Sequence, residues 1–204
     1  MRRRRTRLKG LGVGGLAIAG LLGLWLVWPS AREIAEVVIA PVPVGDGSAM
    51  ASTDADRNAD LLPQVTVRLD MPASVLRGRR ERLGMSIASD PVITAFTLAA
   101  GIVSSDMMAT PPGESGQAFR PGAAFAWTLI AWRGPEASAT MVLRVRRHAA
   151  DGSPVAERLL LARDLQFRVR TVAGFSAPVA AWVAAGLAFG GGLAVLISRR
   201  LREG

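Results

Sequence analysis

The chain has 204 residues, which limits it to one modest domain with appendages. Its formal net charge of +9 would suit a nucleic-acid-binding protein, but residues 31–176 balance 16 Arg against 15 Asp and Glu, so nearly all of the excess lies at the two ends. We therefore expect no nucleic-acid surface. The absence of cysteine excludes disulfides and thiolate chemistry.

Residues 1–10 form a basic head, and residues 11–28 form an apolar run long enough to cross a bilayer as a helix. Trp25 and Trp28 lie near its far end, where membrane-interface aromatics are common. A cleaved signal peptide has the same general pattern. The residues around Trp28, Pro29 and Ser30 lack the small-x-small cleavage signature, which favours an uncleaved anchor.

Residues 29–61 are typical of a tether. Pro41 and Pro43 interrupt regular structure, and residues 48–60 are small, polar and acidic. Within this stretch, residues 32–39 could form a short continuation of the first helix that ends before Pro41, and the alternative is that the stretch is a processed linker.

Residues 62–173 change to a period of two, the pattern of half-buried strands. Turn sequences rich in Pro and Gly separate these strands. The pattern predicts an all-β immunoglobulin-like sandwich of about seven antiparallel strands. The expected strands lie at residues 65–71, 83–87, 94–103, 125–129, 141–145, 155–162 and 165–172.

Residues 177–198 are predicted to form a second transmembrane helix, since Pro178 to Ile197 are twenty residues without a charge. Residues 199–204 form a basic cytoplasmic tail. Positive charges on the outer sides of both apolar runs place both termini in the cytoplasm. The sequence thus predicts a two-span protein of the bacterial inner membrane with a periplasmic or extracellular central domain.

Both apolar runs carry small residues spaced four apart, which allow helices to approach closely in lipid. We expect these stripes to pair the two helices with each other or with copies in a homo-oligomer. A composition rich in Ala and Gly would scatter small residues in the same way. The predicted packing residues are Gly15, Ala19, Gly23, Gly186, Gly190 and Ala194.

Catalytic chemistry has little support, because His148 is the sole histidine and a triad or zinc site needs further ligands. Asp106, Met107, Met108 and His148 are the residues that a copper(I) carrier would use. Adjacent methionines more often pack or form a mobile tip. We therefore expect no catalytic, cofactor or metal residue.

One basic segment offers a surface for lipid headgroups or an acidic partner, although a solvated loop has the same composition. Trp127 and Trp132 fall on opposite faces of one expected strand, so one should lie in the core and the other should be an exposed contact or lie under a loop. The predicted partner-binding residues are Arg77, Arg79, Arg80, Arg82 and Trp132.

These features favour a non-enzymatic protein-binding, accessory or assembly module of a membrane complex, in contact with the lipid bilayer and with other membrane or periplasmic proteins. Two alternatives stay open. One is a membrane-anchored carrier of a metal or small ligand, and the other is a two-helix effector that oligomerises in the membrane.

Overall fold

The computed structural model describes residues 2–44, 61–89, 96–149 and 153–203. The chain divides into two compact units. A helical unit comprises Met1–Ser30, Leu76–Arg79 and Arg170–Gly204, and a β unit comprises Ala31–Val75 and Arg80–Val169.

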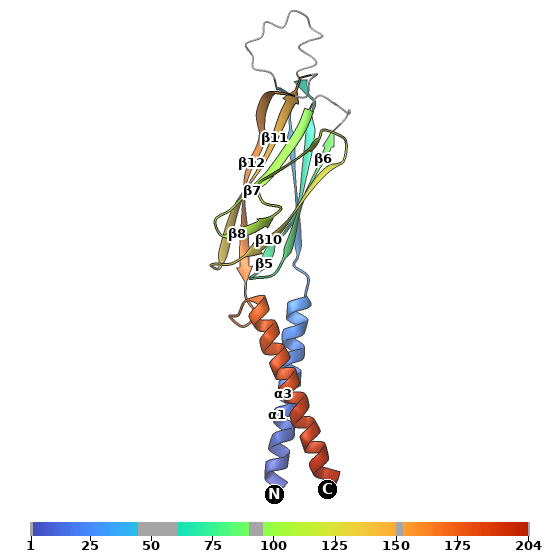
Figure 1. Ribbon diagram of the computed structural model, residues 1–204, viewed down its shortest axis with the longest axis vertical. Coiled ribbons are helices and arrows are strands. Elements are labelled where there is room, and N and C mark those ends of the chain that lie inside the picture. The colour runs from blue at the N-terminus through green and yellow to red at the C-terminus, as the bar shows by residue number, and fades with distance from the viewer. Residues whose placement is uncertain (1, 45–60, 90–95, 150–152, 204) are drawn as a thin grey trace, which may run out of the picture. The chain divides into compact units, whose positions relative to one another are not determined.

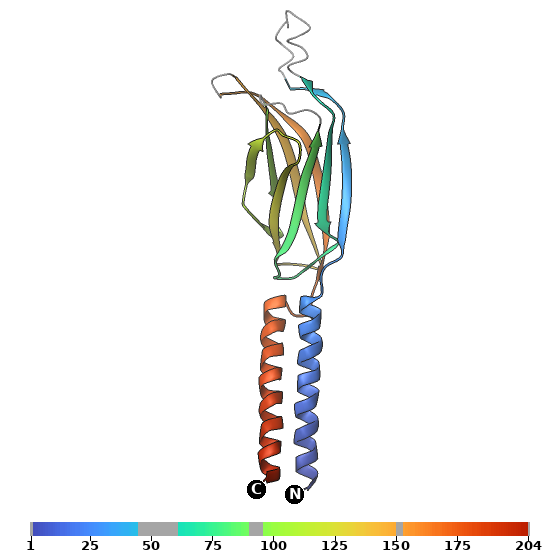
Figure 2. The same ribbon diagram turned by 90° about the vertical axis from the view of Figure 1, so that its right-hand side faces the viewer.

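The β unit is a sandwich of two antiparallel sheets, visible face to face in Figure 1 and Figure 2. The prediction of a β-sandwich is therefore confirmed. In spatial order, one sheet consists of β1 (Arg32–Ile39), β4 (Val65–Pro72), β6 (Glu81–Ser89), β10 (Ala123–Ala131) and β8 (Met107–Thr110). The other consists of β5 (Ser74–Leu76), β12 (Pro154–Arg170), β11 (Glu136–His148), β7 (Phe96–Val103) and β9 (Glu114–Ala118). A short ladder joins β2 (Val42–Pro43) to β3 (Leu61–Leu62).

The core follows from the alternation along the strands. In β4, Val65, Val67, Leu69 and Met71 are buried, while Arg68 and Asp70, which alternate with them, are exposed. Burying each such side chain contributes about 1.5–3 kcal/mol. The largest fully buried side chains in the described part of the chain include Trp127, Phe96, Phe119 and Phe167.

The first strand corrects the sequence prediction. Residues 32–39, which we assigned to the tether as a helical continuation, form β1 and pair with β4 from Arg32↔Pro72 to Ile39↔Val65. Pairing with β4 lets Ala35 and Ile39 pack against the core. Residues 45–60, the rest of the predicted tether, lie outside the described residues.

The last two predicted strands, at 155–162 and 165–172, are one continuous strand of 17 residues, β12. The register shifts between Leu143↔Leu161 and Arg144↔Leu159, so Leu160 is an extra residue on β12. Such a β-bulge lets a long strand bend without ending. The bulge disturbs the period of two and explains why the sequence pattern suggested two strands.

The helical unit contains α1 (Arg2–Val27) and α3 (Ala177–Glu203). The two helices run antiparallel and lie side by side in Figure 1 and Figure 2, so that both chain ends lie at the same end of the pair.

Candidate functional site

One helix in the described part of the chain, Ala177–Arg200 within α3, is long and apolar enough to cross a membrane. The apolar part of α1, Gly12–Val27, is shorter. Length and composition therefore support one membrane span. The expectation of two flanking spans is supported for α3 alone.

The seam between the helices is built from small residues. The buried and half-buried positions of α3 include a series spaced alternately three and four residues apart, as in left-handed helix pairs. This series comprises Ala177, Ala180, Ala184, Leu187, Gly191, Ala194 and Ser198. The corresponding series on α1 comprises Gly12, Gly15, Ala19, Leu22 and Leu26.

The helices approach closely at Gly191 and Gly12. A Cβ atom on Gly191 would lie 2.8 Å from the Gly12 carbonyl oxygen and 3.2 Å from Cγ of Leu16. A Cβ atom on Gly12 would lie 3.0 Å from the Gly191 carbonyl oxygen. Helices in lipid associate mainly through such close packing, so these two glycines fix the spacing of the pair.

The predicted packing residues divide between the seam and the outer faces. Gly15 lies in the seam, where a Cβ would be 3.4 Å from the Leu187 carbonyl oxygen, and Ala194 lies 3.4 Å from the Cβ position of Gly12. Ala19 is half-buried on the same face. For Gly23, Gly186 and Gly190, by contrast, no such contact lies within 4 Å of the Cβ position.

The four-residue turn Leu76–Arg79 makes hydrogen bonds to the end of α1, to the end of β12 and to the start of α3. The Arg79 backbone N–H donates to the Leu76 carbonyl at 2.9 Å, and Gly78 has a φ of 74°, which favours glycine. The Arg77 backbone N–H donates to the Arg170 carbonyl at 2.9 Å, and its carbonyl accepts from the Ala177 N–H at 2.7 Å. The peptide groups flanking Arg77 thus join the end of β12 to the first turn of α3.

The Arg79 side chain reaches the other helix. Its Nη1 donates to the carbonyl oxygens of Leu26 at 2.7 Å and Trp28 at 3.2 Å. These carbonyls lie at the C-terminal end of α1, where helix carbonyls lack intrahelical partners and carry partial negative charge. Arg79 is therefore a C-terminal cap for α1.

Residues 170–176 complete this region. Val172 and Phe175 exchange two backbone hydrogen bonds, of 3.0 and 2.9 Å, around a tight turn in which Ala173 and Gly174 both have positive φ. The Arg170 guanidinium carbon lies 4.5 Å from the centroid of the Trp25 ring, a cation–π contact. We call Leu22–Trp28, Leu76–Arg79 and Arg170–Ala180 together the collar.

Large aromatic side chains of the helical unit are exposed in and near the collar. Trp28 is 63% exposed and Trp182 is 80% exposed, and Trp25 and Phe175 are each about half exposed. Aromatic residues of this kind gather where a membrane meets water. The collar thus combines exposed aromatics with three arginines.

The predicted partner-binding residues fall in both units. Arg77 and Arg79 belong to the collar. Arg80 and Arg82 belong to the β unit, and both of these side chains are exposed. The Arg82 carbonyl accepts a hydrogen bond from Arg32 Nη1 at 2.8 Å. Trp132 is half exposed, while Trp127 is in the core.

The structure separates the residues of the copper hypothesis. Asp106 lies beside Ser138, near the start of β11, and His148 is the last residue of the same strand. Ten residues of extended strand span about 33 Å. Met107 is buried and Met108 is exposed. Among the described residues, no group of three or more His, Cys, Asp or Glu could hold a metal ion.

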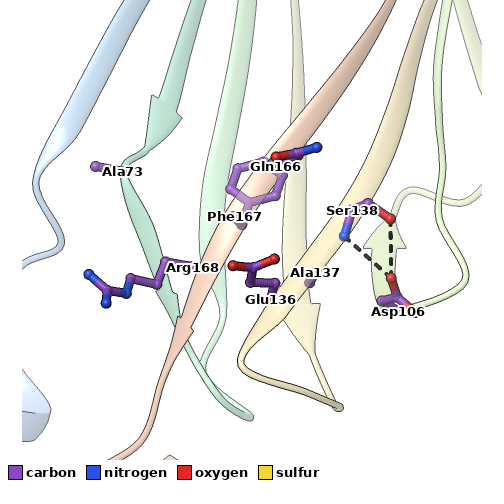
Figure 3. A pocket seen from close by; sticks show the side chains of 8 residues that line it. All are labelled: Ala73, Asp106, Glu136, Ala137, Ser138, Gln166, Phe167 and Arg168. Atoms are coloured by element: carbon purple, nitrogen blue, oxygen red, sulfur yellow. Dashed lines mark hydrogen bonds between the residues drawn. The ribbon is translucent and has the colours of Figure 1, made fainter.

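A shallow pocket of about 500 Å³ opens on the β unit (Figure 3). Asp106 Oδ2 accepts hydrogen bonds from the Ser138 backbone N–H at 3.4 Å and hydroxyl at 3.2 Å, and Oδ1 accepts one from Ser105 at 3.1 Å. These bonds, the Ser138 backbone bond first, lower the pKa of the Asp106 carboxyl. An ionised carboxylate that already accepts hydrogen bonds from Ser105 and Ser138 makes a poor general base. The lining residues are Ala73, Asp106, Glu136, Ala137, Ser138, Gln166, Phe167 and Arg168.

A four-residue ion network crosses the second sheet. Arg144 Nη1 and Arg146 Nε contact the two Glu157 carboxylate oxygens at 2.8 and 2.9 Å, and Arg146 Nη2 contacts Glu114 at 2.9 Å. The hydrogen bond from Arg144 is the main cause of the lowered pKa of Glu157. All four side chains are at least a third exposed, so the network contributes little to stability.

No family model matches the sequence, and no curated protein is similar to it. Solved structures with a related sandwich include WR4, a C. elegans MSP family member, with a TM-score of 0.32, 10% identity, and coverage of 48% of this chain and 89% of that chain. Superoxide reductase (neelaredoxin) from Ignicoccus hospitalis has a TM-score of 0.31 and 12% identity, and the match covers 51% of this chain and 80% of that chain. SSP-19, an MSP-domain protein like family member in Caenorhabditis elegans, has a TM-score of 0.30 and 13% identity, and covers 48% of this chain and 92% of that chain. Likenesses this weak assign the chain to no family.

Proposed function

We propose that this chain is a two-span protein of the bacterial inner membrane. Both termini lie in the cytoplasm, and an immunoglobulin-like sandwich on the opposite side serves as a protein-binding, accessory or assembly module of a membrane complex. The observation that carries the proposal is the antiparallel seam of α1 and α3 around Gly12 and Gly191.

The seam supports a second span because α1 runs the whole length of α3 beside it. The apolar part of α1, Gly12–Val27, covers about 24 Å as a helix, against about 30 Å for the hydrocarbon core. A short segment is accommodated by local thinning of the bilayer and by basic side chains that extend to the headgroups. In the sequence, Lys9 and five arginines at residues 2–7 precede this segment.

Charge supports the orientation. The seam brings the basic segment 2–9 of α1 and the basic segment 199–202 of α3 to the same end of the pair. Arg and Lys near membrane helices accumulate on the cytoplasmic side. The basic segment lies at the N-terminal end of α1, whereas the β unit begins in sequence after the C-terminal end of α1. The net charge of the β unit is close to zero.

Single-cysteine variants test the topology. Because the chain has no cysteine of its own, each label reports on one position. Thr6→Cys, Ala124→Cys and Glu203→Cys are expressed in whole bacteria and treated with a membrane-impermeant maleimide. We expect labelling of Ala124→Cys in cells with a permeabilised outer membrane, and labelling of the other two only after lysis. Labelling of Thr6→Cys before lysis would contradict the two-span topology.

The accessory role is tested by identifying the proteins that copurify with the intact chain from mild detergent. Trp132→Ala is expected to reduce a specific copurifying partner at least several-fold. Met108→Ala, which also truncates an exposed apolar side chain, on the neighbouring strand β8, is the matched control. Equal recovery of every protein with both variants would remove Trp132 from the binding surface, and the absence of any specific partner would contradict the accessory role.

A second candidate function is oligomerisation in the membrane, since Gly186 and Gly190 leave a small-residue face of α3 open. Gly186→Leu with Gly190→Leu is expected to abolish self-association, and toxicity on expression if the oligomer perturbs the membrane. Gly14→Leu with Gly20→Leu is the control on α1, since neither glycine has a close neighbour. A monomeric wild-type chain in detergent and in lipid would contradict this candidate.

A further inference from the structure

We infer that the β unit binds an extended peptide segment of a partner protein as an added strand beside β10, and that a short neutral side chain of this segment accepts a hydrogen bond from Trp127. This inference rests on the proposed protein-binding function and names the kind of segment that one edge of the sandwich recognises.

The first argument is an incomplete sheet edge. On one side of β10, β6 pairs with residues 123–129, but on the other side β8 pairs only with residues 128–131. Pro111 and Pro112 follow β8, and a proline has no N–H group with which to extend the ladder. In the described part of the chain, residues 123–127 of β10 therefore have no strand paired to this edge.

The backbone of Ala126 faces the open edge. On the β8 side, the Trp132 N–H donates to the Asp106 carbonyl at 3.3 Å, and the Ala124 carbonyl accepts from Gln117 Nε2 at 2.9 Å. Every second residue of a strand bonds toward the same side, so the N–H and C=O of Ala126 point this way too. Among the described residues, no strand or side chain bonds to them there. An added strand would pair with Ala126 and take over the bond to Ala124.

The second argument is a small pocket at this edge. Its volume is about 200 Å³, and residues 115–117 of β9 and residues 124–127 of β10 line it. Most of these lining residues are Ala, Gly or Ser, whose side chains leave room for an incoming strand. Pockets for drug-sized ligands are roughly 300–1,000 Å³. This pocket therefore suits a side chain of a larger partner better than a free small molecule.

The third argument is a buried donor. Trp127 lines the pocket and is 1% exposed, and its Nε1 has no hydrogen-bond acceptor among the described residues. Its ring stacks on Phe125, with the two centroids 6.0 Å apart, which fixes the orientation of the indole. Burial of an N–H group without an acceptor is unfavourable, so a ligand that supplies an acceptor gains affinity.

The geometry of a sheet decides which side chain supplies the acceptor. Residues of an added strand that lie opposite Phe125 and Trp127 point to the same face of the sheet as these two side chains. Such residues would enter the pocket. A carboxylate would lose its hydration among the aromatic rings, so a neutral oxygen of Ser, Thr or Asn is the fitting acceptor.

The test uses the full chain in neutral detergent micelles and the peptide acetyl-Ser-Val-Ser-Val-Thr-amide. Its first and third residues would lie opposite Trp127 and Phe125. Two NMR signals are followed, the indole N–H of Trp127, assigned by its loss in Trp127→Phe, and the backbone amide of Ala126. We expect the peptide to move the indole proton signal downfield and to slow exchange of the Ala126 amide on the order of tenfold or more, because both groups gain acceptors.

Matched peptides separate the two contacts. The peptide acetyl-Ala-Val-Ala-Val-Thr-amide lacks the hydroxyls that would reach the pocket, and is expected to bind about tenfold more weakly without moving the indole signal. A peptide N-methylated at its first Val cannot donate to the Ala126 carbonyl and is expected to lose affinity to a similar extent.

The variant Trp127→Phe keeps an aromatic ring but has no donor. It is expected to bind the Ser and Ala peptides with equal affinity. This comparison is made within one variant, so a lower stability does not affect it. If the variant does not fold, the two peptides test the same contact on the wild type.

Several outcomes would overturn the inference. No change in either signal up to the solubility limit of the peptide would contradict the site. Equal affinity of the wild type for the Ser and Ala peptides would remove Trp127 from the contact, and an unprotected Ala126 amide would exclude strand pairing. An equal indole shift with N-methylacetamide would indicate a pocket for small amides, and a shift with protein concentration alone would indicate a second copy of this chain.

The proposed function and this inference fail in different experiments. A chain without an accessory role would show no specific copurifying protein. The peptide titration uses the chain alone and does not depend on that result, so the two failures are distinguishable.

Discussion

Replacement of Gly191 by alanine tests whether the seam holds the two helices together. The added Cβ would lie 2.8 Å from the Gly12 carbonyl oxygen, 3.2 Å from Cγ of Leu16 and 3.3 Å from its backbone nitrogen. Two of these three atoms belong to the α1 backbone and cannot move by a change of rotamer. The helices must separate or shift to accept the methyl group.

The magnitude follows from the contact distances. Restoring ordinary van der Waals contact requires a separation of about 0.6 Å, and gaps of that size forfeit a quarter to a half of each dispersion contact. Overpacking of a tight contact typically costs about 1–3 kcal/mol. Alanine also favours the helix over glycine by about 1 kcal/mol in water, which would hide part of this cost.

The adjacent residue, Gly190, provides a control for the helix propensity of alanine. Gly190→Ala gains the same helix propensity, but its Cβ meets no atom within 4 Å. We expect Gly191→Ala to be less stable than Gly190→Ala by about 1–3 kcal/mol.

Unfolding of the full chain by dodecyl sulfate in mixed micelles, followed through tryptophan fluorescence, to which Trp25 and Trp182 of the helical unit contribute, measures the difference. Gly12→Ala, whose Cβ would lie 3.0 Å from the Gly191 carbonyl oxygen, should show a smaller loss in the same direction. Equal stabilities for the 190 and 191 variants would refute the packing argument.

Three further predictions concern side-chain contacts. Arg79→Met removes the cap of α1 and should lower the free energy of unfolding by about 1–3 kcal/mol in a denaturant titration, whereas Arg80→Met, at an exposed site, should change it by less than about 0.5 kcal/mol. Asp70→Asn weakens the hydrogen bond from Arg32 Nε, which is 2.8 Å long in the wild type and joins β1 to β4. The substitution should therefore speed amide exchange in β1. The pKa of Asp70 is lowered mainly by this bond, so the stabilisation is present above the unfolded pKa of about 3.9 and is lost as the pH falls through the folded value. Wild type and Asp70→Asn should therefore converge in stability below about pH 4, and a constant difference would contradict the assignment. The pKa of Asp106 is lowered in the same sense, so the deficit of Asp106→Asn should likewise shrink under acid in chemical denaturation.

The sandwich could be predicted because the strands that supply its core have one buried face and one solvent-exposed face. In β4 apolar residues alternate with polar ones, and in β10 large apolar residues alternate with Ala and Thr from Phe125 to Leu129; the buried positions follow both patterns. β1 escaped prediction because Ile34 and Val38 lie on the exposed face while Ala35 and Ile39 pack inward, so apolar residues occupy both faces and the sequence does not alternate between apolar and polar residues. The short strands β8 and β9 contain few large apolar residues and leave no pattern.

For the helix seam, the prediction chose the correct residue type, small residues at regular spacing, but only some of the residues that it named contact the other helix. The prediction used a spacing of four, which follows one stripe around a helix and selects Gly186 and Gly190. The seam instead alternates spacings of three and four, and therefore passes through Leu187 and Gly191. Both patterns are present in the same glycine-rich sequence, and only the partner helix decides which one is buried.

The collar could not be predicted, because its contacts join residues far apart in the chain. The hydrogen bonds from Arg79 to Leu26 and Trp28 span 53 and 51 residues. In sequence, Arg77, Arg79, Arg80 and Arg82 form one basic patch, but each has a different environment in the structure. Arg79 caps a helix, Arg77 links two segments through its backbone, and Arg80 and Arg82 belong to the β unit. Arg170, absent from the predicted patch, joins the collar through Trp25. The charge available to a lipid or a protein partner is therefore set by the fold of the two units and not by the density of arginine along the chain.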